Sequence, residues 1–228
     1  MRRVTSVPWH PPRVTLPTDQ LPFLLAVGWL VRAPLVSREE GHEAITRAAW
    51  AGLPLTTAQQ DALMRGVRAP DVSIAGLLVS AVPFAQRRHA LRAWSGSTTA
   101  EAIRDVRAFL AATHRRALSL PEGRRRWEAF GELLHCLQDS YSTAHADRNG
   151  GRILRMRHWG PMDRLRGHDD EHGFPSDRRD SAWRDGTLTE EAGAAVEASR
   201  SYLEIALQRI APLDAFLDRC VSPGVEAA

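Results

Sequence analysis

The chain of 228 residues contains no lysine, so all thirty of its basic side chains are arginine. With 27 acidic residues the formal charge is only +3, which is too small an excess to indicate a nucleic-acid-binding protein by itself. Arginine is nevertheless a good phosphate ligand, because its planar guanidinium can bind two phosphate oxygens at once. Charge alone therefore does not identify the partner of this protein.

Cysteine is almost absent as well. Cys136 and Cys220 are the only two, which excludes a framework of disulfides and a cysteine-type zinc site. Any metal ion must therefore be held by histidine and carboxylate. Nine histidines and 27 acidic residues supply both kinds of ligand.

Long hydrophobic runs are also missing, so we expect no transmembrane segment. The longest run, residues 21–31 (LPFLLAVGWLV), is too short to cross a bilayer as a helix. With Arg2 and Arg3 before it and a small-residue site at 26–28, it has the features of a signal peptide cleaved before Trp29. The long, proline-rich stretch before it, which includes Asp19, instead favours a packed N-terminal segment and a cytoplasmic protein.

The sequence shows no strand pattern and no internal repeat, and its helical periodicity predicts an all-α fold, a compact multi-helix bundle. We expect an N-terminal arm over residues 1–36, one helical domain over 37–220 and a tail over 221–228. The predicted helices are 37–50, opened by a Ser37-x-x-Glu40 capping box; 57 to about 67, ended by Pro70; 72–94; 98 or 99 to 118; 121 to about 139; and 189–220, broken near Pro212. Residues 147–185 are rich in Gly, Arg, Asp and His, and predict one long functional loop.

The helix over 121–139 places His135 and Asp139 one turn apart on the same face. An imidazole and a carboxylate at this spacing can bind one metal ion. His145 follows, about 80° away from His135 on an ideal helix, so it can serve the same cluster or a neighbouring ion. Alone, this pattern is equally typical of a buried helix with incidental polar residues.

Three other residues join this pattern. His42 lies in Gly-His42-Glu-Ala-Ile-Thr, Asp71 follows Pro70, and His89 follows two arginines. Taken singly, His42 fits a core histidine and Asp71 an N-cap. Together with Gly131-x3-His135-Cys-Leu-Gln-Asp139-Ser-Tyr-x3-His145 they resemble the zinc-dependent phospholipase C family and the related single-strand-specific zinc nucleases. The resemblance implies an all-helical bundle that holds zinc ions at the bottom of a cleft and hydrolyses phosphodiester bonds.

The resemblance also implies the ligands of two or three zinc ions. Asp71, His89, His135 and Asp139 would form one site, and Asp139 would bridge to a second ion held by His42. His145 would hold a third ion with a pair from the long loop. The family's pair is His-x3-Glu or His-x3-Asp, and the best match here is His172-x4-Asp177, with His158 and His168 as alternatives. Asp71 is also the candidate general base, whereas Glu132 is given no catalytic role.

A second departure from the family concerns the chain's beginning. Secreted members bind the His42-type ion through the amine and carbonyl of a mature N-terminal tryptophan, and cleavage before Trp29 would supply one. In an uncleaved chain that ion would be bound weakly, be bound by another ligand, or be missing.

The sequence favours a phospholipid substrate with transient membrane-surface contact. The two motifs look closer to phospholipase C, and Trp50, Phe84, Trp94 and Trp159 can form an apolar rim. A single-stranded nucleic acid is the alternative, because Trp159 lies between Arg157 and Arg164, with Arg152 and Arg155 nearby. A non-catalytic helical protein with a degenerate metal site is the third interpretation.

Overall fold

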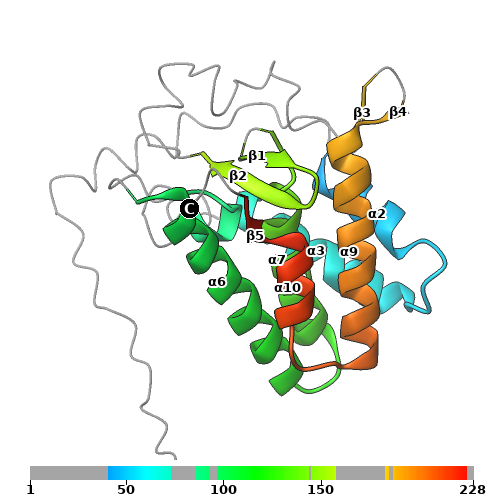
Figure 1. The fold of residues 1–228 in the computed structure, drawn as a ribbon. Helices are drawn as coiled ribbons and strands as arrows, with labels where there is room; N and C mark the ends of the chain where they lie inside the picture. Colours follow the sequence, from blue (N-terminus) through cyan, green and yellow to red (C-terminus); the bar gives the residue numbers. More distant parts are fainter. Residues whose placement is uncertain are drawn as a thin grey trace, which may run out of the picture. The chain divides into compact units, whose positions relative to one another are not determined.

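A computed structural model describes residues 41–72, 86–92, 97–143, 145–157, 183–184 and 187–224. The chain divides between Arg32 and Ala33, and every described residue belongs to the second unit. The fold of this unit is mainly α-helical (Figure 1). Its helices are α2 (His42–Trp50), α3 (Thr57–Val72), the 3-10 helix η1 (Arg87–His89), α6 (Thr99–Ser119), α7 (Arg124–Asp139), α9 (Glu190–Gln208) and α10 (Asp214–Cys220).

Short strands also occur, so the fold is mainly α-helical, as predicted, but it is not free of strands. β1 (Ala146–Asn149) and β2 (Arg152–Met156) form an antiparallel hairpin, and β5 (Ser222–Pro223) pairs with β2 in parallel. β3 (Trp183–Arg184) pairs with β4 (Thr187–Leu188). The hairpin fills the start of the predicted long loop, and β5 lies where a tail was expected. The sequence shows no clear alternation of apolar and polar residues here, because the strands are short and irregular, with a bulge after Asp147.

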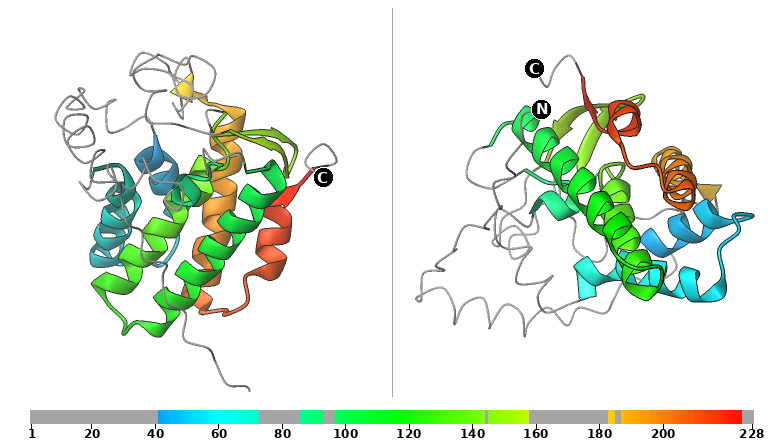
Figure 2. Two further views of the ribbon diagram at one scale, coloured as in Figure 1. Left: turned by 90° about the vertical axis from the view of Figure 1, so that its left-hand side faces the viewer. Right: turned by 90° about the horizontal axis from the view of Figure 1, so that it is seen from below.

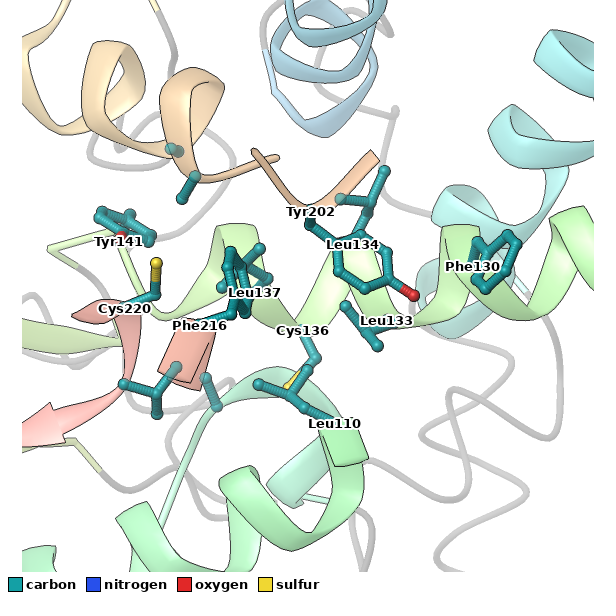
Figure 3. Packing of buried hydrophobic residues seen from close by; sticks show 14 of the residues in the cluster. Leu110, Phe130, Leu133, Leu134, Cys136, Leu137, Tyr141, Tyr202, Phe216 and Cys220 are labelled. Atoms are coloured by element: carbon teal, nitrogen blue, oxygen red, sulfur yellow. The ribbon is translucent and has the colours of Figure 1, made fainter. Parts of the chain in front are cut away.

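The centre of the domain is α7, which contacts α3, α6 and α9 (Figure 2). Every residue from 133 to 139 is buried. Leucines on α7 pack with Leu110 of α6, Tyr202 of α9 and Phe216 of α10 (Figure 3). This part of α7 is buried on all sides, so it lacks a polar face that could place its histidine and aspartate in water. The polar residues of its last turn must therefore find partners inside the protein.

Two glycines allow α3 and α7 to approach each other closely. A Cβ atom on Gly131 would lie 2.1 Å from the carbonyl oxygen of Leu63, and one on Gly66 would lie 2.0 Å from that of Glu128. Both distances are far below van der Waals contact, so neither position can hold a side chain unless a backbone moves. This contact explains the glycine found four residues before His135 in the sequence motif.

Helix α3 continues to Val72 with Pro70 inside its last turn, so the prediction that the proline ends this helix was wrong. A proline removes one backbone hydrogen bond and disfavours helical geometry in the residue before it. Only two residues of α3 follow Pro70, and the close packing against α7 outweighs this local preference.

Two other helices begin later than predicted. α7 starts at Arg124 instead of Pro121, because its N-cap Gly123 has a φ of 141°, a conformation that other residues rarely adopt. α2 starts at His42 after a non-helical Gly41, so this helix does not open at Ser37. The capping box at Ser37 and Glu40, and most of the predicted helix over 72–94, lie outside the described residues.

The remaining helix ends agree with the sequence signals. Thr98 and Glu101 form a reciprocal capping box at α6, and the Thr189 hydroxyl accepts the Ala192 N–H at α9. The predicted break near Pro212 is confirmed, because α9 ends at Gln208 and α10 begins at Asp214. The apolar stripe of the predicted helix over 189–220 places Ile210 in the core, but Ile210 is 40% exposed because it follows the end of α9.

Arg148 joins the hairpin to the ends of two helices. Its guanidinium donates to the carbonyl oxygens of Ser140, just after α7, and Cys220, the last residue of α10, at 2.6 and 2.9 Å. It also lies over the Tyr141 ring, with its carbon 3.9 Å from the ring centre. A positive charge at two helix C-termini offsets the negative ends of both helix dipoles.

Within the described part of the chain, no helix is both long and apolar enough to span a bilayer.

We predict that Gly131→Ala lowers the free energy of unfolding by about 1–3 kcal/mol, because the added methyl group forces α3 and α7 apart. Gly193→Ala is the matched control, since Gly193 lies inside α9 with nothing within 4 Å of its added Cβ. The control should raise the free energy of unfolding by about 0.5–1 kcal/mol through helix propensity. Urea unfolding measures both; equal effects would contradict the close contact.

A second prediction concerns His114, which is buried in α6 away from His135. Its Nε2–H donates to the Ile210 carbonyl at 2.8 Å, and its Nδ1 accepts from the Tyr202 hydroxyl at 3.2 Å. Burial lowers the pKa of His114; the Ile210 carbonyl opposes this shift, and Arg115 adds to it. The folded protein thus keeps this ring neutral where the unfolded chain, with a pKa of about 6.5, binds a proton.

Stability should therefore fall as the pH decreases below about 6.5. We predict that His114→Gln, which keeps a donor and an acceptor, flattens the decrease in free energy of unfolding between about pH 7 and 5. Urea unfolding of both proteins across this range measures the difference. Identical slopes would show that His114 does not contribute.

Candidate metal centre

The last turn of α7 carries the two residues that the sequence placed together. His135 and Asp139 lie one turn apart, with His135 Nε2 3.1 Å from Asp139 Oδ2. The His135 side chain has no solvent exposure, and that of Asp139 is 3% exposed. A carboxylate that deep in a protein requires positive charge or several donors around it. Asp139 therefore marks a site built for cations.

Three further histidines from separate segments face the same carboxylate. His42, the first residue of α2, places Nε2 3.0 Å from Asp139 Oδ1, and His145, just before β1, places Nε2 3.6 Å from it. His89, at the end of η1, places Nδ1 3.2 Å from Oδ2. The structure thus brings together all five of the predicted ligands whose side chains it describes.

The outer nitrogens of three rings are already used as donors. The Nδ1–H of His135 donates to the Val67 carbonyl at 3.0 Å, and that of His145 donates to the His89 carbonyl at 2.5 Å. The Nδ1–H of His42 donates to Gln138 Oε1 at 2.9 Å. A neutral histidine with its proton on Nδ1 presents a lone pair on Nε2. All three Nε2 atoms therefore face the carboxylate, either carrying a second proton, as in an imidazolium ion pair with Asp139, or as ligands of a shared cation.

Contacts from α7 hold η1, and with it His89, against the cluster. Glu132 forms ion pairs with Arg88 of η1 and Arg116 of α6, and the Cys136 Sγ–H donates to the Arg87 carbonyl at 3.1 Å. Glu132 and Cys136 flank His135 along the helix. Glu132 therefore helps to position η1.

Sequence reasoning missed Gln138, which orients His42. Its amide nitrogen donates to the hydroxyls of Thr46 and Ser199 at 2.9 and 3.2 Å, so its oxygen is turned towards the His42 ring. Gln138 is 2% exposed and lies in a helix segment that is otherwise largely apolar. A buried amide needs hydrogen-bond partners for its oxygen and its nitrogen. A glutamine in an apolar helix segment was therefore the sequence signal that could have indicated a structural role for Gln138.

Electrostatics support cation binding at Asp139. Burial raises the pKa of the Asp139 carboxyl, but the positive charges of His145, His135 and His42 and the His135 hydrogen bond outweigh this and hold the pKa well below its usual range. Burial raises the pKa of the Cys136 thiol well above its usual range, and the thiol donates a hydrogen bond. Asp139 is therefore an anion, whereas Cys136 is a neutral thiol and a poor metal ligand.

The geometry of these groups fits a metal ion. Ligand atoms of His42, His135 and Asp139 all lie within 4.8 Å of one another, so this group can hold one metal ion. Imidazole nitrogens with their other nitrogen bound to a carbonyl or amide are the usual arrangement around a protein-bound metal. The donor set contains neither thiolate nor lysine, in agreement with the composition.

Three predicted ligands cannot be placed. His172 and Asp177, and the alternatives His158 and His168, lie outside the described residues. For Asp71 only the backbone is described, as the second-last residue of α3. It follows Val67, the acceptor for His135, by four residues, so the backbone of Asp71 begins one helical turn beyond this contact.

We predict that this centre holds a metal ion, so that zinc, used as the probe, raises the melting temperature of the protein and a chelator reverses this effect. Zinc at 100 times its dissociation constant would add about 2.7 kcal/mol to stability. Asp139→Asn should weaken zinc binding more than about 100-fold, because it removes the charge that all four rings face. Asp105→Asn, at an exposed position of α6, is the control. A melting temperature unaffected by zinc and chelator would refute the metal centre.

The resemblance to phospholipase C and zinc nucleases rests on the motif residues alone. Of these, His42, His89, His135, Asp139 and His145 converge in the structure. Comparison of the chain with models of known families, with curated proteins and with solved structures gives no match. The chemistry of this centre must therefore be argued from its own residues.

Proposed function

We propose that this protein is a zinc-dependent phosphodiester hydrolase of the phospholipase C type. The observation that carries the proposal is the convergence of four imidazoles on the two oxygens of one buried carboxylate. Histidine and carboxylate ligands without thiolate suit zinc in catalytic sites, where a coordination position stays open for water. Zinc bound there would lower the pKa of a water ligand towards neutrality and offset charge on the phosphoryl oxygens.

The exposure of the rings indicates the side from which a substrate can approach. The His42 side chain is 23% exposed and that of His89 is 13% exposed, whereas His135 is completely buried. The centre is therefore closed towards α7 and accessible beside α2 and η1. This arrangement supports the cleft that the resemblance implies.

Asp71 is the proposed general base. Its backbone lies in the last turn of α3, one turn beyond the Val67 carbonyl that accepts the His135 N–H. The resemblance makes this carboxylate the group that takes the proton of the attacking water. The lysine-free composition leaves carboxylate and histidine as the available bases at this position.

The phospholipid is the preferred substrate because both sequence motifs look closer to phospholipase C. Among the residues named for an apolar rim, Trp50 packs partly against the core, which weakens its part in this argument. Arg152 is exposed on β2, with Arg155 exposed farther along the same strand, and these residues support single-stranded nucleic acid as the second candidate.

We predict zinc-dependent hydrolysis of bis(p-nitrophenyl) phosphate, a generic chromogenic phosphodiester, with faster turnover of phosphatidylcholine than of single-stranded DNA. Asp139→Asn should reduce turnover to background, and the Asp105→Asn control should keep it. Faster cleavage of single-stranded DNA would favour the nuclease alternative. If the zinc-loaded protein cleaves none of the three substrates, the hydrolase proposal is refuted and the metal site has a structural role.

A further inference from the structure

The side-chain amide of Gln138 joins three helices next to the metal centre. Gln138 directly precedes Asp139 in α7 and is 2% exposed. Its Oε1 lies 2.9 Å from His42 Nδ1, and its Nε2 donates to the hydroxyl oxygens of Thr46 and Ser199 at 2.9 and 3.2 Å. Thr46 and Ser199 have no solvent exposure. One buried amide thus links α2, α7 and α9.

The partners of the amide nitrogen turn the amide oxygen towards His42. A glutamine amide has two N–H groups, and Thr46 and Ser199 accept one each. The nitrogen is therefore fully used, and the oxygen is the end that faces the His42 ring. His42 and Thr46 are one turn apart in α2, so the two ends of the amide hold successive turns of that helix.

A second contact of the His42 ring restricts its plane. The ring packs beside that of His135, with ring centres 4.2 Å apart and planes tilted by 40°. Packing of this kind does not distinguish the two edges of an imidazole, because a half-turn about the Cβ–Cγ bond leaves the plane unchanged. The hydrogen bond to Gln138 does distinguish them, since it requires Nδ1 on the side of the amide. His42 Nε2 is then held 3.0 Å from Asp139 Oδ1.

The amide oxygen also selects the tautomer of His42. A carbonyl oxygen accepts a proton and has none to donate, so a neutral ring that faces it carries its proton on Nδ1 and a lone pair on Nε2. With the amide turned over, its nitrogen would donate to Nδ1, and the ring proton would lie on Nε2. That proton would bind Asp139 directly and keep a metal ion away from this nitrogen.

We propose that Gln138 is a positioning residue for the metal ion held by His42, His135 and Asp139, a role that rests on the metal centre of the proposed function. Its oxygen keeps His42 in the tautomer that offers Nε2 to a divalent cation. Thr46 and Ser199 act through Gln138, because they hold its nitrogen away from the ring. Neither helical spacing nor the resemblance assigns these three residues a part in metal binding.

The first test is the zinc affinity of the full chain and of variants at position 138. Gln138→Leu should weaken zinc binding at least about 10-fold, because His42 loses the acceptor that orients it. Gln138→Glu should bind zinc at least as tightly as the unmodified chain. Its carboxylate accepts the His42 N–H, and the hydroxyls of Thr46 and Ser199 can both donate to it. Unchanged affinity in Gln138→Leu would overturn the proposal.

A double-variant comparison separates positioning from packing. In a His42→Ala chain, a further Gln138→Leu change should leave the remaining zinc affinity unaltered, because Gln138 acts through that ring. In a His145→Ala chain the same change should still weaken binding at least about 10-fold. An equal loss in both chains would mean that Gln138 only supports the packing of α7, and would overturn the proposal.

Removal of the two hydroxyls supplies a milder test that leaves every ligand in place. Thr46→Val and Ser199→Ala should each weaken zinc binding, and the double variant should weaken it further, because the amide is then free to turn. Thr113→Val, at a buried position of α6, is the matched control and should keep the affinity. Unchanged affinity in the double variant would also overturn the proposal, even where His42→Ala binds zinc too weakly to titrate.

Nitrogen-15 NMR of the histidine rings gives a direct signature, with His42→Ala for assignment. In the zinc-loaded chain, His42 should carry a proton on Nδ1 and bind zinc through Nε2; the reverse would contradict the role of Gln138. Melting of each metal-free variant shows that it folds. Zinc binding is read without hydrolysis, so a chain that binds zinc but cleaves no phosphodiester would refute only the proposed function.

Discussion

The buried carboxylate of Asp139 is the constraint on which the rest of this domain depends. It is the last residue of α7, where the negative end of the helix dipole lies, and its side chain is almost fully shielded from water. An ionised carboxylate in such a place is unfavourable by several kcal/mol unless positive charge compensates it. The compensation comes from imidazoles on four segments: α2, η1, α7 itself and the turn before β1. Those segments must therefore meet at the end of α7.

The rest of α7 brings these segments to the cluster. Gly131 lets α3 approach so closely that the Val67 carbonyl can accept the His135 N–H. Glu132 and Cys136 hold η1 on the neighbouring side, and Gln138 holds α2 through His42. Successive residues of one buried helix thus form both the core and the supports of the metal ligands. Changes to core packing along α7 should consequently affect metal binding.

Helical spacing predicts two residues of the centre and the resemblance predicts three more, but neither predicts the residues that hold these side chains in place. His135 and Asp139 are one turn apart in any helix, and the motif residues His42, His89 and His145 were found by resemblance. Gln138 was missed because its role depends on Thr46 and Ser199, which are far away in the sequence. Pro70 misled the prediction because tertiary packing outweighed a local preference, and the hairpin was missed because irregular short strands leave little alternation.

The exposure of the four rings also indicates from which side a bound metal ion would be reached. His135 is completely buried and His145 is 8% exposed, whereas His89 is 13% and His42 is 23% exposed. A catalytic ion needs an open position for water and substrate, whereas a structural ion is enclosed by protein ligands. Under the proposed function, the edge of the centre at His42 is therefore the better placed to meet a phosphodiester, while the close contact between His89 and His135 holds η1 against α7.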